Sequence, residues 1–69
     1  MSLVITVNGK ATQLPEDHVT LSELLTHLQL DTKHRVIEMN GVIYQSQHFD
    51  ATVIPSKAVI EIVQFVGGG

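Results

Sequence analysis

The residues with the clearest chemical potential stand at the end of the chain, where the sequence is Val66-Gly67-Gly68-Gly69. We expect Gly69 to carry a free α-carboxylate, which is ionised at neutral pH. A carboxylate is a poor electrophile and must first become a mixed anhydride before a nucleophile can displace one of its oxygens. The three glycines carry no side chain, so they resist ordering and expose their backbone. We therefore interpret residues 66–69 as a flexible glycine tail that carries a reactive terminus.

The composition excludes several other kinds of chemistry. The 69 residues include no cysteine, which excludes a disulfide framework, a thiolate metal site and a cysteine nucleophile. The lack of cysteine also fits a cytoplasmic protein. The net charge is -3 and the four basic residues are scattered, whereas nucleic-acid binding normally needs a basic face. No apolar stretch approaches the ~20 residues that cross a bilayer. We expect neither a nucleic-acid nor a membrane partner.

The remaining polar residues predict neither a catalytic site nor a metal site. Glu16 with Asp17, and Glu38 with Glu61, are acid pairs of the kind used in proton transfer, but surface charge explains them more simply. A domain of this size also has little room for a pocket of about 300 Å³. The histidines lack the spacing of metal ligands, and we expect all of them on the surface: His18, His27, His34 and His48.

Two hairpins are predicted around Asn-Gly turns. Residues 3–7 are rich in β-branched side chains, and Asn8-Gly9 is a strong signal for a two-residue turn. Asn40-Gly41 repeats that signal between predicted strands at residues 35–39 and 42–44. The first turn pairs Val7 with Lys10 and so fixes the register. That register places one set of residues on the core face: Leu3, Ile5, Val7, Thr12 and Leu14.

A helix is predicted between the two hairpins. Thr20 is expected as its N-cap and Glu23 completes a capping box, while Val19 and Leu24 can form a hydrophobic staple. Four leucines follow at helical spacing and predict a helix of about nine or ten residues. These leucines are Leu21, Leu24, Leu25 and Leu28.

The strand order predicts an α+β fold. Residues 46–51 are expected to form an irregular or 3₁₀ connection, and residues 59–65 to form the last strand. The first and last strands are the most apolar, so both are expected to be central, adjacent and parallel. This arrangement is a β-grasp: a mixed sheet of about five strands with one main helix packed on one face. We assign residues 1–65 to this domain and residues 66–69 to the tail.

A family resemblance covers nearly the whole chain. The segments that carry it are Val7-Asn8-Gly9, Leu14-Pro15-Glu16, residues 19–25, Glu38-Met39-Asn40-Gly41 and residues 59–69. Together they resemble the ThiS family, the sulfur carriers of thiamine biosynthesis in the ubiquitin-like β-grasp superfamily. Two features depart from the family pattern. Pro55-Ser56-Lys57 replaces a frequent Asp-Gly-Asp turn, and Gln45 stands where many members have a basic residue.

The resemblance implies a carrier that other enzymes act upon, not an enzyme. A ThiF-type (E1-like) adenylyltransferase would use ATP and Mg²⁺ to adenylate Gly69, with Val66, Gly67 and Gly68 threaded into its active site. A sulfur donor such as a cysteine desulfurase would then convert Gly69 to a thiocarboxylate. A ThiG-type thiazole synthase would accept that sulfur. The chain itself is expected to bind no cofactor.

A docking face is predicted on the last strand. If Ile60 and Ile62 face the helix, then Glu61, Val63 and Phe65 lie on the open face of the sheet, where an apolar patch suits a partner. The alternative is that Phe65 is a core residue at the edge of a small domain.

Other functions share parts of this pattern. The small subunit of molybdopterin synthase and tRNA-thiolation carriers use the same terminal chemistry but end in Gly-Gly. A ubiquitin-like modifier would form an isopeptide bond to a lysine. An interaction domain with an idle tail needs no terminal chemistry at all.

Overall fold

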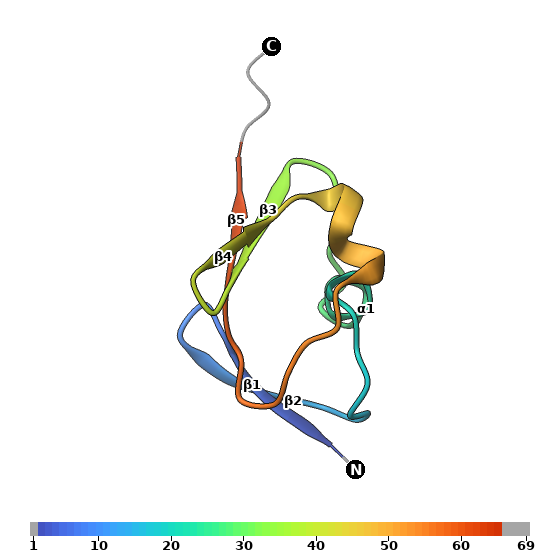
Figure 1. Ribbon diagram of the computed structural model, residues 1–69, viewed down its shortest axis with the longest axis vertical. Coiled ribbons are helices and arrows are strands. Elements are labelled where there is room, and N and C mark those ends of the chain that lie inside the picture. Colours follow the sequence, from blue (N-terminus) through green and yellow to red (C-terminus); the bar gives the residue numbers. More distant parts are fainter. Residues whose placement is uncertain (1, 66–69) are drawn as a thin grey trace.

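The computed structural model describes residues 2–65 of the chain (Figure 1). Its elements are β1 Leu3–Val7, β2 Lys10–Leu14, α1 Leu21–His27, β3 Arg35–Met39, β4 Val42–Tyr44, the 3₁₀ helix η1 Ser46–Ala51 and β5 Val59–Gln64. The order of strands and helices is the predicted one. The predicted glycine tail, residues 66–69, lies outside the described residues. Its flexibility therefore stays a prediction.

The five strands form one mixed sheet in the order β2-β1-β5-β3-β4. The first and last strands are adjacent and parallel, and the remaining neighbours are antiparallel. Helix α1 and η1 both lie on one side of this sheet and cover its inner face (Figure 1). The predicted α+β, β-grasp architecture is therefore confirmed.

Both Asn-Gly turns form as predicted. Asn8 and Gly9 have φ of 48° and 82°, and Asn40 and Gly41 have φ of 51° and 86°. Positive φ at both central residues is the signature of a type I′ turn, whose twist matches that of the flanking strands. The β1–β2 register joins Val7 to Lys10 and Leu3 to Leu14, as the turn position requires.

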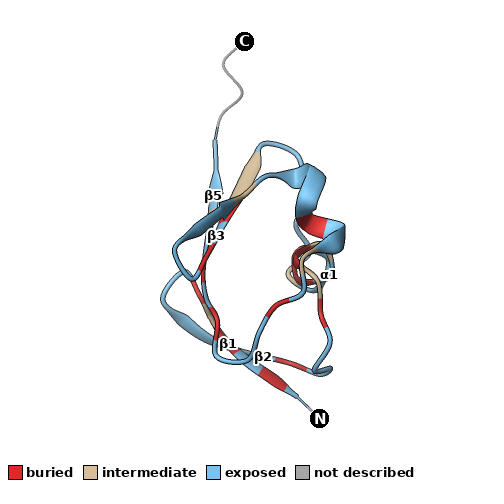
Figure 2. Ribbon diagram, in the orientation of Figure 1, coloured by how far each residue is buried: buried red, intermediate tan, exposed pale blue. Residues whose placement is uncertain are grey.

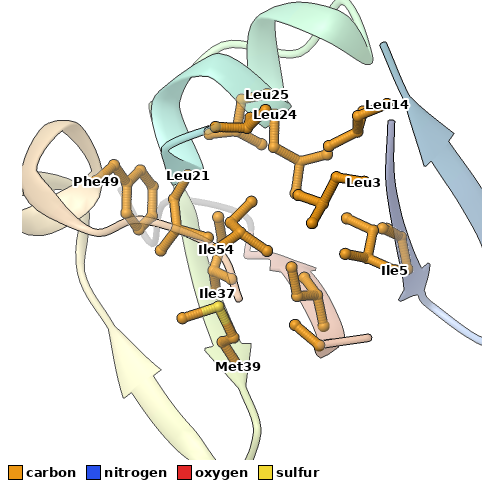
Figure 3. Close-up of a cluster of buried hydrophobic side chains, with 14 residues drawn as sticks. Leu3, Ile5, Leu14, Leu21, Leu24, Leu25, Ile37, Met39, Phe49 and Ile54 are labelled. Carbon is orange, nitrogen blue, oxygen red and sulfur yellow. The ribbon is translucent and has the colours of Figure 1, made fainter. Parts of the chain in front are cut away.

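The core lies between the sheet and the layer of α1 and η1 (Figures 2 and 3). Leu3 and Leu14 from the first hairpin lie beside Leu24 of the helix (Figure 3). The placement of Thr12 in the core is wrong in part, because β2 is an edge strand and leaves Thr12 only half-buried. Conversely, Phe49 of η1 is fully buried, a role that the sequence pattern did not predict.

Helix α1 has seven residues, fewer than the predicted nine or ten. Its start is as predicted, with Thr20 and Glu23 forming both hydrogen bonds of a capping box. Its end comes early because Gln29 adopts φ of 62°. The N–H of Leu30 then donates to the carbonyl of Leu25 at 2.8 Å, and the N–H of Gln29 to that of Thr26 at 3.0 Å. This is a Schellman termination with glutamine in the usual glycine position.

Candidate functional site

Strand β5 leads directly to the glycine tail, and it is held unequally on its two sides. On one side it pairs with β3 over five positions, from Met39 opposite Ile60 to Arg35 opposite Gln64. On the other side it pairs with β1 at only two positions, the last being Val7 with Ile60. The C-terminal half of β5 therefore extends past the end of β1 (Figure 1).

Two turn asparagines extend the hydrogen-bond ladders of β5. The Oδ1 atom of Asn8 accepts the N–H of Ile62 at 2.7 Å, and its Nδ2 donates to the Ile62 carbonyl at 3.3 Å. The side-chain amide thereby takes the place that the next β1 residue would occupy. On the opposite side, Oδ1 of Asn40 accepts the N–H of Val59 at 2.9 Å. The sequence predicted the turns but not these contacts.

Phe65, the last described residue, is fixed by His34 although β5 ends one residue earlier, at Gln64. The N–H of Phe65 donates to the His34 carbonyl at 2.9 Å. The two rings meet edge to face, with centroids 6.1 Å apart and planes at 90°. This pair holds Phe65 against the loop that precedes β3.

The loop that presents His34 is organised by Asp31. The guanidinium of Arg35 donates to both the carbonyl and the carboxylate of Asp31, each at 2.6 Å. The N–H of Lys33 also donates to that carboxylate, at 3.0 Å. These bonds define the short loop in which His34 adopts φ of 59° and turns its carbonyl to Phe65.

The side chains of β5 divide between the two faces of the sheet as expected. Ile60 is fully buried and Ile62 is partly buried against the core. Val63 and Phe65 are 49% and 48% exposed, and Glu61 is exposed as well. Phe65 is thus not the edge core residue of the alternative interpretation. The docking role of these three residues stays a prediction.

Residues of β3 and β4 lie beside Glu61 and Val63 and extend this exposed surface. Val63 lies opposite Val36, and Glu61 lies opposite Glu38, which in turn lies opposite the 67% exposed Ile43. We call Val36, Glu38, Ile43, Glu61 and Val63 the open-face patch. Two like charges directly opposite each other destabilise a sheet. Within residues 2–65 the one ion pair joins Arg35 to Asp31, so neither glutamate of the patch is neutralised there.

The predicted absence of a metal cluster can be examined within residues 2–65. That part of the chain contains no group of three or more potential ligands placed to hold a metal ion. All four histidines are exposed, as predicted. No helix in the described range is long and apolar enough to cross a membrane.

Comparison with known proteins identifies the family. The model of the ThiS family matches residues 4–69, which includes the whole glycine tail. The chain belongs to the ThiS family. It is 35% identical over 66 residues to the sulfur carrier protein ThiS of Bacillus subtilis (strain 168), covering 96% of this chain and 100% of that one. It is also 29% identical over 68 residues to the ycf40 protein of Porphyra purpurea, covering 99% of this chain and 94% of that one.

Solved structures agree with this assignment. The crystal structure of the thiamine biosynthesis protein ThiS from Geobacter metallireducens matches with a TM-score of 0.82 at 30% identity, covering 97% of this chain and 100% of that chain. A solution NMR structure of a thiamine biosynthesis protein from the same organism gives a TM-score of 0.76 at 30% identity, with 97% and 88% coverage. The fold and the family thus rest on sequence and structure together.

Proposed function

We propose that this protein is a sulfur carrier of thiamine biosynthesis and that Gly69 is the residue that carries the sulfur. The observation that supports this most directly is the match to the ThiS family, which continues through Gly69. The relatives named as a sulfur carrier and as a thiamine biosynthesis protein favour this pathway over molybdopterin synthesis or tRNA thiolation. In this role the protein is a co-substrate and contributes no catalytic residue.

The reaction has two steps at the terminal carboxyl group. A carboxylate oxygen of Gly69 attacks the α-phosphorus of Mg²⁺-bound ATP on a ThiF-type adenylyltransferase, and pyrophosphate leaves. The outer sulfur of a persulfide formed by a donor such as a cysteine desulfurase then attacks the activated carbonyl carbon, and AMP leaves. A second thiol cleaves the resulting acyl disulfide, which releases the thiocarboxylate and leaves that thiol in a disulfide. The resulting thiocarboxylate is the sulfur source for a ThiG-type thiazole synthase. Because the first step consumes ATP, we place the cycle in the cytoplasm.

The partner enzyme recognises the folded domain, and the tail enters the partner's active site. Val66, Gly67 and Gly68 provide the narrow segment between Phe65 and the reacting carboxyl group. Fixing one such residue costs roughly 1–2 kcal/mol of backbone entropy. Docking of the folded surface has to offset that cost, so a partner must contact the domain as well as the tail.

The surface proposed for this contact is the open-face patch together with Phe65. Val63 and Phe65 supply apolar area beside the exit of the tail. Glu38 and Glu61 add two negative charges in the same area, and no ion pair among residues 2–65 neutralises them. A partner suited to this surface has an apolar area with a basic side chain positioned to meet both carboxylates.

The test is intact-mass spectrometry of the protein incubated with a ThiF-type enzyme, ATP, Mg²⁺ and a sulfur donor. We expect a mass gain equal to the exchange of one oxygen for sulfur. A variant that lacks Gly69 should show no gain while keeping its melting temperature, because the buried core cluster runs from Leu3 to Ile60. The absence of any gain, in a system that thiolates a control carrier, would contradict the proposal. A ladder of covalent conjugates in cells would instead indicate a protein modifier.

A further inference from the structure

At the end of β5, main-chain groups that face away from β3 have no partner within the described part of the chain. Hydrogen bonds toward β3 are made at odd-numbered positions, as the bonds of Val59 and Phe65 to residues 40 and 34 show. Even-numbered positions bond toward β1: the Ile60 carbonyl accepts the N–H of Asn8, and Ile62 bonds the Asn8 side chain. By this alternation the N–H and C=O of Gln64 point to the β1 side. No hydrogen bond to them is present among residues 2–65.

Within the described residues, Gln64 lacks these hydrogen bonds because β1 ends before it. Val7 is the last β1 residue and lies opposite Ile60, and the Asn8 amide reaches one step further, to Ile62. Among the described strands, none lies beside the next step, at Gln64, because β2 lies on the far side of β1. Exposed edges are usually protected by lysine, proline or a bulge. Here the flanking residues are instead the half-exposed Val63 and Phe65.

The sequence beyond this edge indicates what occupies it. Val66 supplies the only side chain after Phe65, so a protein that holds the tail has mainly N–H and C=O groups to bind. Extended main chain is held in this way by strand addition. From Gln64 to Gly69 an extended chain spans about 17 Å. A partner strand that begins to pair at Gln64 would therefore fix the direction in which the tail and its Gly69 carboxylate enter the partner.

We propose that the β1-side edge of Gln64 is a strand-addition site for an extended main-chain segment of the ATP-dependent activating enzyme. This inference rests on the proposed function and adds the mode of contact to it. The main chain of Gln64 is the binding group and its side chain is dispensable. Pairing at Gln64 brings the tail into register before its carboxylate meets ATP.

Amide hydrogen exchange measured by NMR tests the contact directly on the ¹⁵N-labelled wild-type protein. In the free protein the Gln64 amide should exchange quickly, while the Val63 amide, which faces β3, should be protected. Addition of saturating activating enzyme without ATP should slow exchange at Gln64 by at least tenfold. If Gln64 still exchanges at its free rate in the complex, the strand-addition site is disproved.

A main-chain variant provides a second test, and the chain is short enough for chemical synthesis. N-methylation of Gln64 removes the outward donor without breaking a bond to β3, and Gln64→Ala is the matched control that keeps the main chain intact. We expect Gln64→Ala to be adenylated like the wild type, and the N-methyl protein to fold normally but lose roughly five- to tenfold in kcat/KM, the worth of one hydrogen bond.

Three outcomes overturn the inference in distinguishable ways. If the N-methyl protein is adenylated as well as the wild type, only the strand-addition site fails. If the free protein is a dimer that N-methylation splits, a second copy occupies the edge in place of the enzyme. If the wild type is never adenylated, the proposed function fails together with the site.

Discussion

The side-chain amide of Asn8 pairs with the backbone of Ile62, 54 residues further along the chain, accepting its N–H at 2.7 Å. The same amide donates to the Ile62 carbonyl at 3.3 Å. Asn8 therefore does two things at once: it forms the β1–β2 turn and it closes the ladder between β1 and β5. Asn8 therefore helps to hold β5 on the β1 side, while pairing with β3 holds it on the other.

Replacing Asn8 by glycine should destabilise the domain by about 1–2 kcal/mol, since glycine tolerates the positive φ but removes both amide bonds. For a domain of this size, each 1 kcal/mol lowers the melting temperature by roughly 4–8 °C. Thermal denaturation followed by circular dichroism measures the change. Gly9→Ala is the control for the turn, because it strains φ of 82° while leaving Asn8 in place. A melting temperature for Asn8→Gly equal to that of the wild type would show that the long-range amide contributes nothing.

Replacing Glu61 by glutamine should stabilise the fold and weaken partner binding. The carboxylates of Glu38 and Glu61 repel each other across β3 and β5, so neutralising one should raise the free energy of unfolding by roughly 0.2–1 kcal/mol. Both residues are exposed, so the gain should shrink as salt screens the repulsion. Denaturant titrations at low and high salt measure it, with Glu16→Gln in the loop after β2 as the control. Binding to the activating enzyme should weaken in the same variant, and a variant that loses stability would contradict this account of the patch.

Replacing Phe65 by alanine should separate recognition from folding. The side chain is 48% exposed and its ring contact is with His34, so we expect the melting temperature to fall by only a few degrees. Adenylation should lose about tenfold or more in kcat/KM, as expected for an aromatic anchor at a contact surface. Val53→Ala is a suitable control because Val53 is 44% exposed and lies outside β5. A Phe65→Ala protein that unfolds, or that is adenylated normally, would disprove the docking role.

The sequence predicted the fold well because its local signals agree with one another. The two Asn-Gly turns and the Thr20–Glu23 capping box act over a few residues, so they could be identified without the structure. The apolar alternation of β5 correctly placed Val63 and Phe65 on the surface. What the sequence did not predict depends on distant segments. The pairing of Asn8 with Ile62 and the open edge at Gln64 follow from where β1 ends beside β5, and no local pattern encodes that register.

Phe49 illustrates the same limit within the core. It is one aromatic residue among polar neighbours in residues 46–51, so neither helical nor strand periodicity marks it as buried. In the fold, η1 lies against α1 and places Phe49 beside Leu21 (Figure 3). The hydroxyl of Ser22 also bonds the carboxylate of Asp50, which joins the two elements at the surface. The connection predicted as irregular or 3₁₀ is thus a 3₁₀ helix, and it completes the hydrophobic core.

Replacing Phe49 by alanine should unfold most of the protein at physiological temperature. Truncating a fully buried phenylalanine costs about 3–5 kcal/mol, and a 69-residue domain without cross-links has little more than that in total. Chemical denaturation and amide exchange measure the loss, and Phe49→Leu should retain much of the stability because it leaves a smaller cavity. His48→Ala is the control, since His48 lies beside Phe49 in η1 but is exposed. If Phe49→Ala melts within a few degrees of the wild type, η1 is not part of the core that supports α1 and β5.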